Sequence, residues 1–535
     1  MSLICLGLAS CNDFLDLTPS DRVSDKAAWE KPEITDMYVN NFYEYLNVYS
    51  PFGSGQFQGN LTEGLTDQLK YGSFVTGNRA GDCNNYVFTP EIISSTGCML
   101  NCWDPTYVRI RRINEFLAAM VKFSNYSPEM NLRYEAQARF FRAFLYFQLA
   151  KRHNAVIIYD NLDNMRKDIE LSTPEATWQF IYDDLTFAAE NLPEAWNSEN
   201  EGRVTKGAAY ALLSRAMLYA ERWQDARTAA EQVFALGRYQ LAPTYEQGYA
   251  GRNSESILEF KYQTTAPFHQ WDRYMALYHE YTTGGSSTPT QEMVESYESM
   301  DGGKVDWTEW HQENGTLRYP PYRELEPRFA ATVLYNGAKW KGKELENCVN
   351  GKYGIFVDYG TEPYPYGKTT TGYYVRKFRQ ESNYDLDNVP CTSTWVELRL
   401  AEVYLVHAEA CFRLNDAGAA VRDLEKIRSR VGLPTDMGLS GENLFAAIRQ
   451  ERKIELAFEG HLWWDMRRWR LAEEAYTGIR THGMKITKEG SGYRYTLVDC
   501  DGKDRTFLKR LYRLPIPDTE LRNNSLMKQF DEWNF

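Results

Sequence analysis

The sequence predicts a mainly α-helical fold: a scaffold of tetratricopeptide-like helical repeats, forming an α/α superhelix, that carries long irregular loop excursions. Three segments show the same order of an amphipathic helix, a short turn and a second helix. Two long stretches lack a helical period and are rich in glycine, asparagine and proline. Aromatic residues make up 14% of the chain and charged residues 25%, which is typical of a folded protein.

The clearest helix pair spans residues 206–239. Ala209, Leu212 and Ala216 recur at spacings of three and four, so they lie on one helical face. A second helix begins at Trp223 and returns along the first. This length matches a tetratricopeptide repeat, whose period is about 34 residues. Two further pairs follow the same plan, at residues 134–153 with 177–192 and at residues 399–434.

The two excursions span residues 51–104 and 240–398. Stretches such as TTGGSSTP, at residues 282–289, are dense in turn-forming residues. Loops on a rigid scaffold commonly carry function, so we expect ligand contacts in these excursions.

The charge balance excludes one broad class of function. The chain has 60 Lys and Arg against 73 Asp and Glu, a formal net charge of -13. Nucleic-acid binding requires a basic surface, and no run of Lys and Arg marks one, so we expect no nucleic-acid partner. Beyond the amino terminus, no run of about 18 apolar residues predicts a membrane-spanning helix.

The amino terminus suggests a membrane anchor of another kind. Residues 4–9 form a short apolar run before Cys11, and the order LASC resembles the lipobox of bacterial lipoproteins, in which the cysteine carries the lipid. Alternatively, Cys11 is an ordinary cysteine. We expect residues 1–10 to be the remnant of a lipoprotein signal and 11–535 to form one domain. Within it we distinguish an amino-terminal part (about 11–240), a loop-rich insert (240–398) and a carboxyl-terminal part (399–535).

Metal and cofactor sites are not expected. The nine cysteines include no pair with two residues between them, and seven histidines are scattered along the chain. Cys83, Cys98 and Cys102 lie in one excursion and could form a disulfide in an oxidising compartment, and the pairing is open.

The stretch ERKIELAFEGHLWWDMRRW, at residues 451–469, has the composition of an active site. On a helical wheel, however, its apolar residues form one stripe, with His461 and Asp465 near the centre. Buried polar groups must be hydrogen-bonded, so we assign His461 and Asp465 a structural role. We expect the other face, with Glu455, Glu459 and Arg467, to meet solvent or a partner.

The chain resembles the SusD/RagB family of surface lipoproteins of Bacteroidetes. The resemblance runs from Cys11 to Phe535 and rests on four features in order. These are LASC followed by FLDLTP, the helix EAQARFFRAFLYFQLAKRH, the paired RLAEVYLVHAEA and ERKIELAFEGHLWWDMRRW, and the ending RLPIPDTELRNNSLMKQ.

The resemblance implies a SusD-like fold and a binding function without catalysis. Members of the family capture an oligosaccharide outside the cell and pass it to a SusC-like TonB-dependent transporter. The expected partners are thus an oligosaccharide or polysaccharide, that transporter, and the outer membrane, to which the lipid on Cys11 would anchor a surface-exposed protein.

Candidate ligand-binding residues follow from sugar chemistry. Aromatic rings stack on the C–H faces of a sugar, and amide, carboxylate and guanidinium groups bind its hydroxyls. In 240–398, Trp307 and Trp310 lie in a polar, Gly-bounded stretch and either line a site or pack beneath the loop. Trp271, Tyr274 and Tyr278 are spaced as on one face of a helix, and such a stripe more often packs in a core than lines a site. The candidates are Asp67, Arg79, Asn84, Asn85, Trp271, Tyr281, Trp307 and Trp310.

Two other functions are compatible with the sequence. Tetratricopeptide repeats often bind peptides, which would make the protein an interaction scaffold. A glycoside hydrolase needs only two carboxylates roughly 5 to 10 Å apart in a cleft, and acids are plentiful. No HExxH, GxSxG, P-loop or dinucleotide motif is present, so we expect no enzyme and no catalytic residue.

Overall fold

The computed structural model describes residues 29, 31–53, 62–72, 86–360, 367–436 and 438–534. Helices are the predominant regular structure in these ranges, as predicted. None of the helices in these ranges is both long enough and apolar enough to cross a membrane. The helices are α2 (Pro32–Tyr49), α4 (Trp103–Phe123), α5 (Pro128–His153), α6 (Pro174–Asn191), α7 (Lys206–Tyr219), α8 (Trp223–Ala235), α9 (Tyr245–Ala250), α10 (Trp271–Tyr274), α11 (Gln291–Glu295), α12 (Pro327–Thr332), α13 (Leu400–Arg413), α14 (Ala417–Arg430), α15 (Gly441–Glu455), α16 (Leu462–Arg468), α17 (Ala472–Tyr476) and α18 (Asp518–Asn523).

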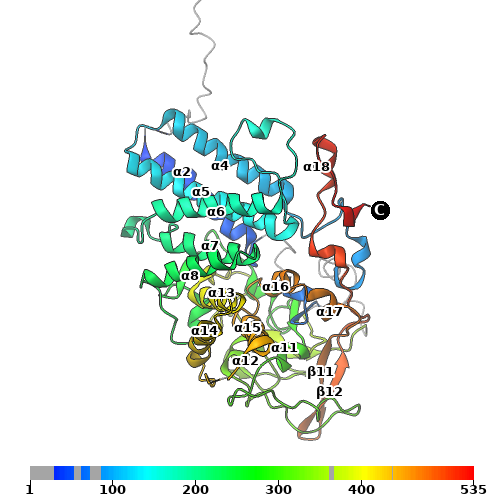
Figure 1. The fold of residues 1–535 in the computed structure, drawn as a ribbon. Coiled ribbons are helices and arrows are strands. Elements are labelled where there is room, and N and C mark those ends of the chain that lie inside the picture. The colour runs from blue at the N-terminus through cyan, green and yellow to red at the C-terminus, as the bar shows by residue number, and fades with distance from the viewer. Residues whose placement is uncertain are drawn as a thin grey trace, which may run out of the picture.

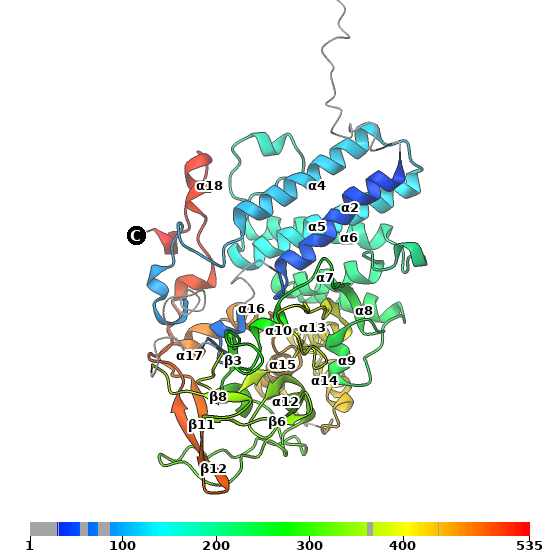
Figure 2. The same ribbon diagram turned by 180° about the vertical axis from the view of Figure 1, so that it is seen from behind.

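The long helices stack in sequence order. Figure 1 shows α4, α5, α6, α7, α8 and α13 following one another down the molecule, and each packs against the next. The three predicted helix pairs are confirmed as α5 with α6, α7 with α8, and α13 with α14. From behind, α2 is seen to run along α5 (Figure 2).

Local sequence explains where these helices begin and end. Ser127 and Thr173 cap α5 and α6 by accepting bonds from the backbone N–H groups of the third helical residues, and a proline follows each cap. The last turn of α5 holds Lys151 and Arg152, and cationic side chains favour the negative end of the helix dipole.

The repeats remain continuous across the long insert. α8 packs directly on α13, and the rings of Phe234 and Tyr404 stack at 4.6 Å. The insert leaves and returns through one antiparallel pair, in which β2 (Ser256–Phe260) lies beside β10 (Trp395–Arg399). Residues between these strands can therefore form a separate layer without separating the helices.

Strands in the described ranges pair two by two. Besides β2 with β10, the pairs are β1 (Leu69–Tyr71) with β3 (Ser287–Pro289), β4 (Val333–Leu334) with β9 (Tyr374–Val375), β5 (Lys339–Trp340) with β6 (Lys343–Glu344), β7 (Asn347–Val349) with β8 (Gly354–Phe356), and β11 (His482–Glu489) with β12 (Gly492–Asp499). All are antiparallel except β7 with β8. The β11–β12 hairpin projects at the end of the molecule away from α4 (Figure 1).

Hydrophobic residues form separate cores for these layers. One cluster runs through α4 to α8 and continues into the carboxyl-terminal segment, while another fills the insert and includes Ile454 and Phe458. A third lies between α13, α14 and α15 and contains Cys411, which is fully buried. The insert thus has its own aromatic core beside the repeats.

Candidate functional site

The charged stretch at residues 451–469 forms two helices instead of one. α15 ends at Glu455 and α16 begins at Leu462. Between them, Phe458 and Gly460 adopt φ angles of 63° and 80°. Because Phe458 is not a glycine, its left-handed conformation must be held by the surrounding packing. A single helical wheel therefore does not describe this stretch.

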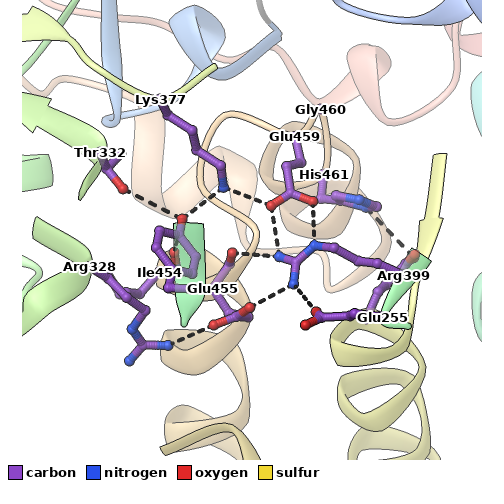
Figure 3. A network of polar contacts seen from close by, with 12 residues as sticks. Glu255, Arg328, Thr332, Lys377, Arg399, Ile454, Glu455, Glu459, Gly460 and His461 are labelled. Atoms are coloured by element: carbon purple, nitrogen blue, oxygen red, sulfur yellow. Dashed lines mark hydrogen bonds and ion pairs between the residues drawn. The ribbon is translucent and has the colours of Figure 1, made fainter. Parts of the chain in front are cut away.

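The expectation that Glu455, Glu459 and Arg467 face solvent or a partner is wrong. Their exposed fractions are 0%, 6% and 4%. The turn directs both glutamates at Arg399, which lies at the centre of a buried network (Figure 3). Arg399 donates to Glu455 Oε1 at 2.7 Å, to both oxygens of Glu459 at 2.7 and 2.8 Å, and to Glu255 at 3.1 Å.

The network joins the repeats to the insert. Lys377 of the insert donates to Glu459 at 2.7 Å, and Arg328 of α12 reaches Glu455 at 3.2 Å (Figure 3). Burial raises the pKa of Glu455, but Arg430, Arg399 and Arg328 together hold it well below its usual range. Burial lowers the pKa of Lys377 to about 8 despite its contact with Glu459. The stretch that most resembled an active site is thus occupied by structural ion pairs.

His461 and Asp465 lie at the start of α16. Asp465 is 1% exposed and accepts bonds from Arg452 at 3.0 and 3.2 Å and from Arg468 at 2.7 Å. His461 is half-buried, with Nδ1 3.9 Å from Glu402 Oε1. Burial, and then nearby cations, hold its pKa well below the usual value, so the ring is neutral at pH 7.

The three candidate tryptophans belong to the core of the insert. Trp271, Trp307 and Trp310 are only 1%, 5% and 4% exposed, so the structure favours the core alternative and does not support them as ligand-binding candidates. Trp310 donates from its indole nitrogen to the Arg318 carbonyl at 3.1 Å, and Trp307 packs against Tyr322. Their aromatic neighbours come from other parts of the insert, so the polar stretch around them did not reveal their burial.

The two excursions meet at one sheet. β1 pairs with β3, and the Gly72 N–H donates to the Ser286 carbonyl at 2.8 Å. The Asp67 carboxylate is 2.8 Å from Lys453 Nζ, which occupies it as an ion pair. Tyr281 precedes β3 and is half-buried. The candidates Arg79, Asn84 and Asn85, like Cys11, lie outside the described residues.

Tyr281 belongs to a group of tyrosines that we call the tyrosine surface: Tyr274, Tyr278 and Tyr281. Tyr274 is 39% exposed and the other two are half-buried. The Arg273 guanidinium stacks 4.4 Å from the ring centre of Tyr281 and donates to its hydroxyl. Lys368 Nζ lies 5.5 Å from the ring centre of Tyr278. Aromatic faces thus stand beside cationic donors.

Glu280 fixes the turn that presents these rings. Its carboxylate accepts bonds from the Trp340 indole at 2.9 Å, from Arg379 at 2.6 Å and from the Leu277 N–H at 2.9 Å, and Lys341 Nζ lies 2.7 Å away. Burial raises its pKa, but Arg379 and Lys341 outweigh burial and bring it to about 2. A fixed turn lowers the entropy that a ligand must remove on binding.

Sequence reasoning identified Tyr281 but assigned Tyr274 and Tyr278 to a helical stripe. α10 ends at Tyr274, so the stripe breaks and only its first member, Trp271, enters the core. Glu280 carried no recognisable signal, because its partners lie some 60 to 99 positions later in the chain. The exposed histidine beside it, His279, belongs to no cluster of three metal-ligating side chains within the described residues.

The fold and this surface define a helical-repeat protein whose insert presents aromatic side chains on fixed turns. Residues 13–218 match the family described as "Starch-binding associating with outer membrane", and residues 246–533 match the SusD family. The chain belongs to the SusD family.

Related proteins resemble this chain over nearly its whole length. A SusD-like protein of Bacteroides ovatus is 23% identical, and the match covers 94% of this chain and 88% of the relative. SusD-like protein P2 of Formosa agariphila is also 23% identical, and the match covers 98% of this chain and 97% of the relative. The crystal structure of a SusD-like protein from Bacteroides fragilis is 28% identical with a TM-score of 0.77, covering 96% and 99%. A SusD-like carbohydrate-binding protein from the same species is 23% identical with a TM-score of 0.78, covering 94% and 99%.

Proposed function

We propose that the protein binds oligosaccharides or polysaccharides at the tyrosine surface. The observation that carries the proposal is the turn held by Glu280, which presents aromatic rings with cationic donors beside them. Tyrosine rings can stack on the C–H face of a sugar while Arg273 and Lys368 donate to its hydroxyls. Each such bond contributes only about 0.5 to 1.5 kcal/mol net, so the rings are needed for affinity.

Related proteins support a carbohydrate ligand. One structural neighbour is named a SusD-like carbohydrate-binding protein, and another, 22% identical with a TM-score of 0.62, a laminarin-binding SusD-like protein, covering 94% of this chain and 99% of its own. The description of the family that residues 13–218 match names starch binding and association with the outer membrane, which supports the same class of ligand.

We further propose that the protein delivers its ligand to a SusC-like TonB-dependent transporter and is held at the outer membrane, exposed on the cell surface, by lipid on Cys11. Expressed with a complete secretory signal, the protein is expected to enter the detergent phase on phase partitioning. The variant Cys11→Ser should stay in the aqueous phase. Equal partitioning of the two would contradict the anchor.

We propose a binding function without catalysis. The described residues do bring a thiol, an imidazole and a carboxylate together, since Cys411 Sγ lies 3.4 Å from His407 Nε2 and His407 Nδ1 bonds to Asp423. Cys411 is completely buried, however, so a substrate has no access to its sulfur. Nucleophilic catalysis requires an accessible thiolate.

The proposal is tested by removing two rings of the tyrosine surface. After a screen of polysaccharides, the double variant Tyr274→Ala, Tyr281→Ala should bind the retained glycan about tenfold more weakly in affinity electrophoresis, since each stacked ring contributes about 0.5 to 1.5 kcal/mol beyond its buried area. Tyr38→Ala is a matched control, because Tyr38 is 40% exposed on α2. Unchanged retardation of the double variant would refute the site.

A further inference from the structure

A separate cavity of about 570 Å³ lies between the carboxyl ends of α5 and α7, the amino end of α6, and α16. A smaller one of about 80 Å³ shares four of its lining residues. The larger volume falls in the range of small-molecule sites, roughly 300 to 1,000 Å³. The shared residues are Lys151, Arg152, Tyr219 and Trp464.

The larger cavity is strongly cationic. Two glutamates, Glu175 and Glu221, also line it, in a chain whose formal net charge is -13. Three of the cations surround one indole: Lys151 Nζ lies 5.0 Å, Arg152 Cζ 4.6 Å and Arg467 Cζ 4.9 Å from the Trp464 ring centre. The lysines and arginines that line the cavity are Lys151, Arg152, Arg222, Arg467, Arg468 and Arg470.

Some of these cations have acidic partners and others do not. Arg468 pairs with Glu409 and Asp465. Among the described residues, no carboxylate forms an ion pair with Lys151 or Arg467. Arg467 instead donates to backbone carbonyls, at 2.8 Å to Leu511 and 2.9 Å to Tyr512 among others, which leaves its charge unneutralised.

The pKa values of both groups are lowered, first by burial and then by neighbouring cations. Burial, followed by the neighbouring Arg152, holds the pKa of Lys151 well below its usual range. Burial, Arg152 and Arg470 lower the pKa of Arg467 to about 9. Placing cations together without counter-charges costs stability, and a bound anion would recover that cost.

The remaining walls suit a sugar ring. Tyr219 and Tyr512 are half-buried and line the larger cavity, as does the exposed side chain of Asn154. Trp464 itself is only 3% exposed beneath the cations, so it cannot serve as a stacking platform for a neutral sugar. Charge therefore dominates recognition here, in contrast to the tyrosine surface.

We propose that this cavity binds an acidic sugar, whose carboxylate is held by Lys151 in the positive field of Arg467 and Arg470. A carboxylate near an ammonium group forms a charge-assisted hydrogen bond, roughly twice as strong as a neutral one. The Tyr219 and Tyr512 rings, which have the Arg468 and Arg470 guanidiniums at 5.4 and 4.8 Å, would lie beside the sugar, and the side-chain N–H group of Asn154 would donate to its hydroxyls. The site is distinct from the tyrosine surface, so neither proposal depends on the other.

Calorimetric titration of the full chain with glucuronate tests the proposal. Glucuronate should bind and glucose should not, and inorganic sulfate should bind more weakly than glucuronate. Absence of glucuronate binding, or equal binding of glucose, would overturn the proposal. Sulfate binding as tight as glucuronate would reduce the cavity to a simple oxyanion site and would overturn the assignment to a sugar.

Variants separate this role from a structural one. Lys151→Met should weaken glucuronate binding at least tenfold without lowering the melting temperature, because it removes a cation that forms no ion pair with an acid among the described residues. Lys122→Met is the matched control, since Lys122 is exposed on α4 beside the ring of Phe123. A lower melting temperature with unchanged affinity would make Lys151 a structural residue. The Tyr274→Ala, Tyr281→Ala variant should bind glucuronate normally.

Discussion

Replacing Arg399 with methionine should strongly destabilise the protein. Arg399 makes five hydrogen bonds, four to the carboxylates of Glu255, Glu455 and Glu459 and one at 2.7 Å to the Glu455 carbonyl. It is 1% exposed, and its position at the start of α13 links the repeats to the turn after α15. Arg399→Met keeps much of the side-chain volume but leaves the three glutamates with fewer cations.

The expected loss can be bounded from the contacts that remain. Hydrogen bonds to charged groups contribute about 1.5 to 3 kcal/mol each, so five independent bonds would exceed about 7 kcal/mol. The bonds are not independent, because Glu455 keeps Arg430 and Arg328 while Glu459 keeps Lys377. We therefore expect the loss typical of one broken buried ion pair, about 3 to 5 kcal/mol.

Thermal unfolding followed by circular dichroism measures this loss. An unfolding entropy of about 2.1 cal/mol/K per residue gives about 1.1 kcal/mol/K for cooperative unfolding of the whole chain, so the melting temperature should fall by about 3 to 5 °C. The control is Arg449→Met on α15, whose partner Glu442 has a side chain that is 75% exposed. Such a pair contributes less than about 1 kcal/mol. A shift for Arg399→Met no larger than that of the control would refute the reasoning.

Two pH effects should follow from buried groups. Burial lowers the pKa of His407, but its bond to Asp423 raises the pKa well above the usual value. The protonated His407 therefore stabilises the folded protein. This contribution is complete below the unfolded pKa of about 6.5 and is lost as the pH rises through the raised value. Asp423→Asn should flatten the decline of melting temperature between pH 6.5 and 10, and an unchanged slope would contradict the pairing. The pH dependence expected from Glu280 has the opposite sign. Because its pKa is about 2 in the folded protein, its ionised form contributes stability above about pH 4.5, and that contribution is lost as the pH falls towards 2. Glu280→Gln should reduce the acid sensitivity of melting, and an identical acid profile would exclude its role in fixing the turn.

The repeats were predictable because their signal is local. In α7 and α8, apolar residues recur at helical spacing, and Thr205 caps α7 by accepting a bond from the Ala208 N–H. The same holds for α13 and α14, where Asp416 caps the second helix. Such patterns depend on neighbours within a few residues, so one sequence is enough to read them.

The break between α15 and α16 was not predictable from periodicity. The left-handed conformation of Phe458 depends on packing against the core of the insert, which the local pattern does not show. That bend turns Glu455 and Glu459 towards Arg399, whose place in the sequence lies more than 50 residues earlier. A helical wheel assumes a straight helix and therefore assigned both glutamates to the wrong face.

How far each candidate site could be predicted from the sequence depended on how many of its residues are brought together by tertiary contacts. Tyr281 could be identified because it lies in a turn-rich excursion. The cationic cavity could not be predicted from the sequence, because two of its lining residues, Lys151 and Arg467, lie 316 positions apart. Lys151 comes from α5, Tyr219 from α7 and Arg467 from α16. Burial of Trp307 and Trp310 depended in the same way on distant aromatic partners.

Binding of glycan at the tyrosine surface is the central claim, and hydrogen–deuterium exchange with and without a retained polysaccharide tests it most directly. Amides of residues 272–286 should become protected when the glycan binds, while those of α2 and of the repeat pair α13 with α14 should not change. Protection confined to the repeat helices, with residues 272–286 unaffected, would contradict the account and favour an interaction scaffold.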